Sequence, residues 1–217
     1  FEDCNFEYRY LINCAGLYAD KIAKQFGCAK KYTILPFKGM YLKYLGKDNI
    51  LKKNVYPIPN LKNPFLGIHF TLTADNRIKI GPTAAPAFWR ENYRGFSNFN
   101  IFEFFHIIFY QAKLFIFNSF NFRELAINEM KNYFKSNIYY EAKGLVKKLD
   151  NNFGKIPAGI RAQLLNKETN ELVDDFVIEH TENSTHVLNA VSPGFTCSFS
   201  FSEYVLDQIK NNRKEVL

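Results

Sequence analysis

The sequence predicts an α+β fold in which a mixed β-sheet is combined with helices. Three observations support this fold class. An apolar run passes through a small-residue turn into a helix at the start of the chain, a hairpin and a helical block fill the middle, and two short strands precede a helix at the end. With 217 residues, of which 47% are hydrophobic and 23% charged, the chain has the composition of a globular protein that buries a core.

The first elements are expected to be a strand at residues 8–15 and a helix at residues 17–26. Apolar residues recur at helical spacing in the second segment, as they do on the buried side of a helix. Residues 32–45 are expected to form two extended runs, because Pro36 and Gly39 divide them.

The middle of the chain begins with a predicted hairpin, whose strands are residues 65–73 and 77–81. The two prolines of residues 55–59 argue against a central strand there. Helices are expected at residues 101–117 and from about residue 122 to residue 140, where the pattern is dense in aromatic residues.

The helix expected at residues 101–117 invites comparison with a membrane span. Glu103, His106, Gln111 and Lys113 interrupt it, so a buried or lid helix is the preferred interpretation. Attachment of this helix to a membrane surface is the alternative.

The C-terminal part is expected to contain strands at residues 175–180 and 186–191, joined by a polar turn. A helix that includes residues 204–209 should follow and end at residues 211–212.

The net charge of +7 raises nucleic acid or an anionic membrane as a partner. The lysines are scattered, however, and the chain is rich in Phe, Tyr, Lys, Asn and Ile, which AT-rich codons supply. We therefore attribute the charge to codon drift on a solvated surface and expect no nucleic-acid partner, with a basic nucleic-acid-binding module as the alternative.

The four cysteines form no CxxC pair, and the four histidines lack the spacing of metal ligands. We expect no metal site, no disulfide framework and a reducing, intracellular compartment. His180 and His186 are expected at the surface, on either side of a turn.

The segment SPGFTCS, residues 192–198, is the first candidate for a binding site, because a strand end, a glycine and a helix start follow one another there. Free N–H groups and the positive end of the helix dipole suit an anion or a developing negative charge. An ordinary helix capped by Ser or Thr is the alternative.

Three side chains are candidates for substrate chemistry. Arg161, in PAGIRAQ, is of the type that binds a carboxylate through two hydrogen bonds, or else forms a surface ion pair. Lys38, in PFKGMY, is a second candidate partner for a carboxylate. His69, in GIHF, is either a general base or a core histidine.

Six segments in chain order resemble the second half of the L-2-hydroxyglutarate dehydrogenase family, within the FAD-dependent glycine/D-amino-acid-oxidase-like superfamily. They are INCAGLYADKIA, ILPFKGMYLKY, VYPIPNLKNPFLGIHFT, IKIGPTAAPAFWRENY, PAGIRAQ and NAVSPG. The resemblance covers about residues 8–95 and 155–210, whereas residues 97–150 follow the family loosely.

This resemblance implies oxidation of the 2-hydroxyl of a hydroxy diacid, L-2-hydroxyglutarate, to 2-oxoglutarate. FAD would accept the hydride and pass electrons to an acceptor such as a quinone. The resemblance also implies a mitochondrial location in a eukaryote, or the cytoplasm or inner-membrane surface in a bacterium.

The resemblance further assigns residues to roles. His69 and Arg161 would be catalytic, and Lys38, Tyr41 and Thr83 would bind the substrate. The residues expected to contact FAD are Cys14, Ala15, Gly16, Ser192, Pro193, Gly194 and Thr196.

By the same resemblance, residues 1–30 would be a late strand–helix piece of a split FAD-binding domain, residues 31–155 the substrate-binding domain, and residues 156–217 the C-terminal strands and helix that contact FAD. No glycines stand as GxG, so the N-terminal dinucleotide-binding half is expected to be missing.

Two positions depart from the family, which often has Glu where Met40 stands and Asn where Thr83 stands. An FAD enzyme that acts on another hydroxy acid or an amino acid is therefore one alternative. A truncated, non-catalytic fragment that binds no FAD is another.

Overall fold

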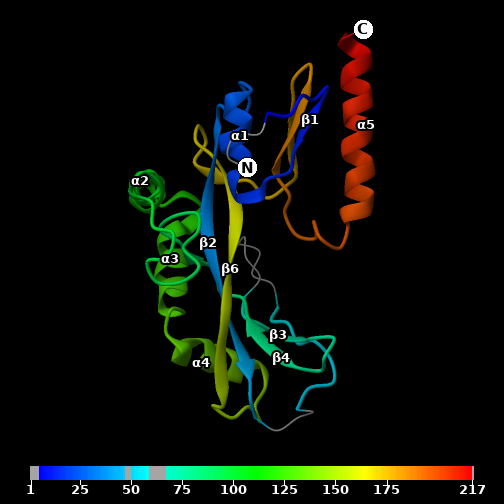
Figure 1. Ribbon diagram of the computed structural model, residues 1–217. Coiled ribbons are helices and arrows are strands. Elements are labelled where there is room, and N and C mark those ends of the chain that lie inside the picture. The colour runs from blue at the N-terminus through cyan, green and yellow to red at the C-terminus, as the bar shows by residue number, and fades with distance from the viewer. Residues whose placement is uncertain (1–4, 47–49, 59–66, 217) are drawn as a thin grey trace. The chain divides into compact units, whose positions relative to one another are not determined.

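The computed structural model describes residues 5–46, 50–58 and 67–216, and the chain divides into two compact units. The first unit consists of Phe1–Ile34 and Ala162–Leu217, and the second of Leu35–Arg161. Figure 1 shows their helices and strands. Both element types occur in each unit, which confirms the predicted α+β class.

The first unit contains a three-stranded sheet of order β1-β9-β8. Its strands are β1 (Leu11–Asn13), β8 (Val177–His180) and β9 (Ser184–Asn189). β1 runs parallel to β9, with Leu11 opposite Ser184 and Asn13 opposite His186, while β8 and β9 form an antiparallel hairpin. Segments from the two ends of the chain therefore build one sheet.

Helical segments of the first unit pack on this sheet through small and branched residues. They are η1 (Gly16–Tyr18), α1 (Ala19–Gln25) and α5 (Ser198–Val216). Ala19 and Ala23 of α1 are fully buried in a cluster with Leu188, while Val205 and Ile209 of α5 pack against Val187. Alanine at the α1 contact lets the helix approach the sheet closely.

A second sheet has the strand order β3-β4-β2-β6-β7, and β5 also pairs with β2. The strands are β2 (Tyr32–Tyr44), β3 (His69–Leu72), β4 (Ile78–Gly81), β5 (Ala85–Pro86), β6 (Phe153–Asn166) and β7 (Glu171–Leu172). β3 and β4 form the predicted hairpin, of which residues 65 and 66 lie outside the described residues.

The helices of the second unit are α2 (Ile101–Phe117), η2 (Ser119–Asn121), α3 (Phe122–Lys131) and α4 (Lys135–Leu145). Figure 1 shows them along one side of β2. The side chain of Asn100 caps α2 by accepting from the N–H groups of Phe102 and Glu103. In the described part of the chain, every helix is too short or too polar to span a bilayer.

The core of the second unit defines two faces of its sheet. Leu42, Ile80 and Phe70 lie side by side on β2, β4 and β3, and they pack with Ile138 and Ala142 of α4. Successive side chains of a strand point to opposite faces. The residues next to these three, Tyr41, Gly81 and His69, therefore belong to the opposite face of the sheet.

Several expected boundaries were wrong. Residues 32–44 form one strand, since Pro36 lacks an N–H but its carbonyl still accepts from Ala87 at 3.1 Å. The helix expected to run to residue 140 is two helices, because Phe134 between them has extended backbone. α5 continues to Val216, past its expected end.

Two strands also differ from expectation. The first strand has three residues, Leu11–Asn13, where eight were expected. The 14-residue strand β6, Phe153–Asn166, was not foreseen in a segment that contains two glycines and a proline.

Candidate functional site

The open face of the second sheet brings His69 and Tyr41 near each other, and Arg161 interacts with Tyr41. His69 on β3 lies opposite Gly81 on β4, and Tyr41 is the β2 residue beside Gly81. Arg161 on β6 interacts electrostatically with Tyr41: burial raises the pKa of Tyr41, and the positive charge of Arg161 opposes that shift. A base, a hydroxyl and a guanidinium thus come from three different strands.

The imidazole of His69 is held by its own loop. Nδ1 lies 3.0 Å from the carbonyl oxygen of Gly67, and the ring packs on Tyr56 with centroids 4.7 Å apart. A carbonyl oxygen can only accept, so in the neutral ring Nδ1 carries the proton and the lone pair is on Nε2. His69 is only partly buried, and this nitrogen is free to act as a base.

Gly81 makes room for Tyr41 in this arrangement. A Cβ on Gly81 would lie 2.6 Å from the carbonyl oxygen of Met40 and 3.0 Å from Cδ1 of Tyr41. Gly81 also has φ +131°, a conformation that residues with a side chain rarely adopt. The ring of Tyr41 therefore lies against bare backbone at the centre of the face.

Lys38 lies away from that group. It has the same parity along β2 as Met40 and Leu42, which pack with the helix-side core. Lys38 is 7% exposed, its Nζ lies 5.8 Å from the centroid of the Tyr133 ring, and burial lowers the pKa of its amine. Among the described residues, no carboxylate lies within ion-pair distance of Lys38.

Thr83 joins β2 to the segment before β5. Its hydroxyl donates to the carbonyl of Lys38 at 3.0 Å and accepts from the N–H of Met40 at 2.9 Å. Thr83 is 3% exposed, and its only hydroxyl proton is used within the protein. Its proposed contact with a substrate stays a prediction.

Glu129 on α3 was not selected from the sequence, because no local pattern distinguishes it from a surface glutamate. Its Oε2 accepts from the N–H of Ala84 at 2.7 Å, and its charge acts on Arg161. Four residues later, the Tyr133 hydroxyl donates to the carbonyl of Pro86 at 2.9 Å, and burial raises the pKa of Tyr133 to about 12. These contacts attach the α3 region to Ala84 and to β5.

The residues expected to contact FAD lie in the first unit, in two segments. Cys14, Ala15 and Gly16 follow β1 directly, and Ser192 stands three residues after β9. Because β1 and β9 are parallel, both segments leave the same edge of the sheet, the edge at which ligands of open α/β sheets bind. Cys14, Ala15, Gly16, Ser192, Pro193 and Thr196 are all exposed.

The second of these segments is a tight turn that opens into α5. The N–H of Gly194 donates to the carbonyl of Val191 at 2.7 Å, and the hydroxyl of Thr196 donates to that of Pro193 at 3.0 Å. A Cβ on Gly194 would lie 2.9 Å from the Val191 oxygen, so the turn needs glycine. No acidic side chain stands in the first turn of α5, which leaves its positive end uncompensated.

His186 contradicts the expectation of a surface residue. It is 0% exposed, and its ring packs on Phe26 with centroids 5.0 Å apart. Its Nδ1 lies 3.0 Å from Nδ2 of Asn13, a buried residue at the end of β1. Asn13 was not among the predicted site residues, although an Asn directly before a small-residue turn is a signal for a side chain that bonds to the turn.

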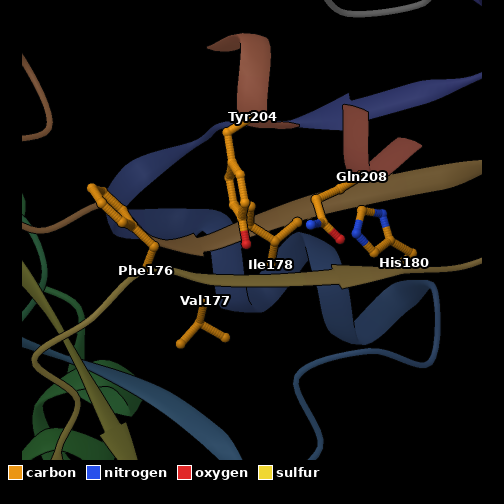
Figure 2. Close-up of a pocket in the computed structure, with 6 residues that line it drawn as sticks. All are labelled: Phe176, Val177, Ile178, His180, Tyr204 and Gln208. Atoms are coloured by element: carbon orange, nitrogen blue, oxygen red, sulfur yellow. The ribbon is translucent and has the colours of Figure 1, made fainter. Parts of the chain in front are cut away.

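A cavity of about 280 Å³ also lies in the first unit, between β8 and α5 (Figure 2). Its lining residues are Phe176, Val177, Ile178, His180, Tyr204 and Gln208. None of the predicted site residues lines it. Within the described ranges, His, Cys, Asp and Glu side chains nowhere gather in a group of three that could hold a metal ion, and Cys14, Cys28 and Cys197 are free thiols.

Comparison with known proteins gives relatives over almost the whole chain. This chain is 34% identical to mitochondrial L-2-hydroxyglutarate dehydrogenase of Bos taurus over 215 aligned residues. The alignment covers 95% of this chain and 45% of the relative. The Homo sapiens enzyme is 36% identical (93% and 44% covered), and the Salmonella houtenae enzyme is 32% identical (94% and 48% covered). The chain thus spans about half the length of the curated relatives that it matches.

The fold has a counterpart among solved structures. Dithionite-reduced L-alpha-glycerophosphate oxidase from Mycoplasma pneumoniae, with FAD bound, matches with a TM-score of 0.57 and 20% identity, over 91% of this chain and 41% of that one. This likeness shows the fold.

The residues of the first unit fit FAD. Where a Cβ of Gly16 would stand, no atom beyond its own stretch of backbone lies within 4 Å, and φ is +52°. Open backbone at Gly16 and the uncompensated start of α5 suit a cofactor that carries negative charge. The family model for FAD dependent oxidoreductases matches residues 2–208. The chain belongs to the family of FAD-dependent oxidoreductases.

Proposed function

We propose that this chain forms the substrate-binding and flavin-contacting part of a dehydrogenase that oxidises L-2-hydroxyglutarate to 2-oxoglutarate. The observation that carries the proposal is the placement of His69 and Tyr41 on the open face of the second sheet, with Arg161 of β6 in electrostatic interaction with Tyr41. The names of the relatives supply the substrate. The second unit would bind the substrate, and the first would contact FAD.

In this proposal Arg161 binds a carboxylate of the substrate through its planar guanidinium. Nε2 of His69 takes the proton of the 2-hydroxyl, and the Tyr41 hydroxyl orients the same group. Bound FAD would accept the hydride from C2. The proton and the hydride that leave the substrate are thus both accounted for, and the product is a 2-oxo acid.

Lys38 receives a different role from the one expected. Its place against Tyr133, on the helix side of β2, supports a structural role rather than a second contact with the carboxylate that Arg161 binds. Met40 also packs with the helix-side core. The difference from the family at Met40 therefore leaves the open face unchanged, which favours L-2-hydroxyglutarate over another hydroxy acid or an amino acid.

The test of the base is His69→Ala in the complete protein, with L-2-hydroxyglutarate and an artificial electron acceptor. We expect kcat to fall by about 10²-fold or more, the usual contribution of a general base. His106→Ala, which changes an exposed histidine on α2, is the control and should keep wild-type turnover. Unchanged turnover in His69→Ala would remove His69 from the mechanism.

The test of the carboxylate site is Arg161→Ala, for which we expect a raised KM. Arg161→Lys keeps the charge but not the two-hydrogen-bond geometry, so its KM should lie between those of the wild type and Arg161→Ala. Arg77→Ala, which removes an exposed partner of Asp75, is the matched control. A KM unchanged in both Arg161 variants would refute this role.

We also propose an electron acceptor such as a quinone, reached at a membrane surface. Phe102, Phe105 and Phe109 recur at helical spacing on the exposed side of α2, which supports attachment of this helix to a bilayer interface. The compartment would be the mitochondrion in a eukaryote, or the cytoplasm or inner-membrane surface in a bacterium. Co-sedimentation with vesicles should decrease in Phe105→Ser, and equal binding of variant and wild type would contradict the attachment.

A further inference from the structure

A chain of buried polar groups lies beneath the turn Cys14–Gly16. Asn13 is 4% exposed, and both His186 and Ser184 are 0% exposed. Asn13 ends β1, while His186 and Ser184 lie on the neighbouring strand β9. Buried polar groups are costly unless they are hydrogen-bonded, so each bond in this chain constrains the next.

Two backbone groups fix the amide of Asn13. The N–H of Ala15 can only donate, and it donates to Oδ1 at 3.1 Å. The carbonyl of Ala19 can only accept, and it accepts from Nδ2 at 2.9 Å. The amide therefore has one orientation, and it holds the turn from both sides: Ala15 lies within it and Ala19 begins α1.

The orientation of the amide determines the protonation of His186. The second hydrogen of Nδ2 points to Nδ1 of His186, 3.0 Å away, so Nδ1 must accept. The proton of the neutral ring is then on Nε2, which donates to Oγ of Ser184 at 2.9 Å. The hydroxyl of Ser184 can in turn donate to Thr181 at 2.5 Å.

We infer that Asn13 is the positioning residue of the Cys14–Gly16 turn, and that it holds the turn in its flavin-contacting shape only while His186 is the neutral Nε2–H tautomer. The inference rests on the proposed contact of this turn with FAD. A proton on Nδ1 would face the hydrogens of Asn13, so the amide would have to release Ala15 and Ala19 to escape.

The surroundings of His186 favour its neutral form. Burial lowers the pKa of His186, the charge of Glu179 on β8 opposes the shift, and His180 on the same strand adds to it. From α1, the buried carboxylate of Asp20 is used by the N–H of Ile34, and the ring of Phe26 covers the imidazole. A fall in pH therefore acts on the turn through His186.

The first experiment measures the ¹⁵N shifts of the His186 ring by NMR in the complete protein without flavin. We expect the Nε2–H tautomer near neutral pH. A ring protonated on Nδ1, or on both nitrogens, at that pH would overturn the inference. In Asn13→Asp, the carboxylate offers no hydrogen to Nδ1, so we expect the pKa of His186 to rise; an unchanged tautomer and pKa would also overturn it.

The second experiment measures FAD affinity by flavin fluorescence after reconstitution. His186→Asn keeps an acceptor near the position of Nδ1, and we expect its affinity within about threefold of wild type, whereas His186→Leu leaves Asn13 with an unmatched hydrogen and should bind about tenfold more weakly. Wild-type affinity should also fall as the pH decreases, and His186→Asn should lose most of that dependence. Equal affinity and equal pH dependence in wild type and both variants would refute the positioning role.

The two experiments separate this inference from the proposed function. A wild-type protein that takes up no flavin would refute the flavin contact of the turn and, with it, the second experiment's premise. The tautomer of His186, measured without flavin, would still decide whether Asn13 holds the turn in the way described.

Discussion

Gly81→Ala tests the geometry of the open face most directly. Gly81 is buried, has φ +131°, and lies against the ring of Tyr41. Holding an L-residue in such a conformation costs about 1–3 kcal/mol. A Cβ placed 2.6 Å from the Met40 oxygen and 3.0 Å from Tyr41 adds a clash, for which overpacking gives about 1–3 kcal/mol more.

We therefore expect Gly81→Ala to lose roughly 2–6 kcal/mol of unfolding free energy, measured by urea denaturation with linear extrapolation. The matched control is Gly144→Ala in α4, where no atom outside the backbone of the helix lies within 4 Å of the added Cβ. There the same substitution should gain about 0.5–1 kcal/mol, since alanine favours a helix over glycine. A loss below about 1 kcal/mol in Gly81→Ala would refute the argument.

Three further outcomes follow from contacts described above. Thr83→Val should lose about 1–3 kcal/mol in the same assay, because it leaves two buried backbone groups unpaired, while Thr83→Ser should lose less; equal losses would contradict the role of the hydroxyl. Tyr133→Phe should lose about 1 kcal/mol of unfolding free energy, because the hydrogen bond to Pro86 is lost. The pKa of Lys38 should stay as in the wild type, since Lys38 contacts the ring and not the hydroxyl; a changed Lys38 pKa would contradict this. Because burial lowers the pKa of His186 in the folded state, the unfolded chain takes up the extra proton at a higher pH than the folded chain does. The contribution of His186 to the unfolding free energy should therefore be fully present above about pH 6.5 and decrease below it. A His186→Asn protein should lose less unfolding free energy on acidification.

Sequence patterns predicted the local elements well. The helix at residues 101–117 has the expected bounds, because its spacing and the Asn100 cap are both local signals. The hairpin of β3 and β4 was also predicted, since its turn fixes the pairing of adjacent strands.

Features that depend on distant partners were missed. β6 contains Gly154, Pro157 and Gly159, which locally disfavour a strand, and it is extended because β2 pairs with it. His186 was expected at the surface because its partner, Asn13, stands 173 positions away. The face that Lys38 occupies depended on which β2 residues contact α4, which no local pattern reports.

Arg161 and His69 were selected from residue type and resemblance, and the structure supplies what those could not. Strand register puts His69 beside Gly81 and Tyr41. The chemistry of a side chain could thus be predicted from its residue type, whereas its spatial neighbours could be identified only from the fold.

The pairing of β1 with β9 has a consequence for biogenesis. β1 is synthesised well before Ser184–Asn189 and must wait for that segment, because Asn13 and His186 are separated by 173 positions. Such long loops are closed slowly, and unpaired strands are prone to aggregate in the meantime. The second unit, Leu35–Arg161, leaves the ribosome earlier and as one continuous segment. During synthesis the nascent chain would therefore carry a folded second unit and an exposed β1, which makes the first unit the part that depends most on chaperones.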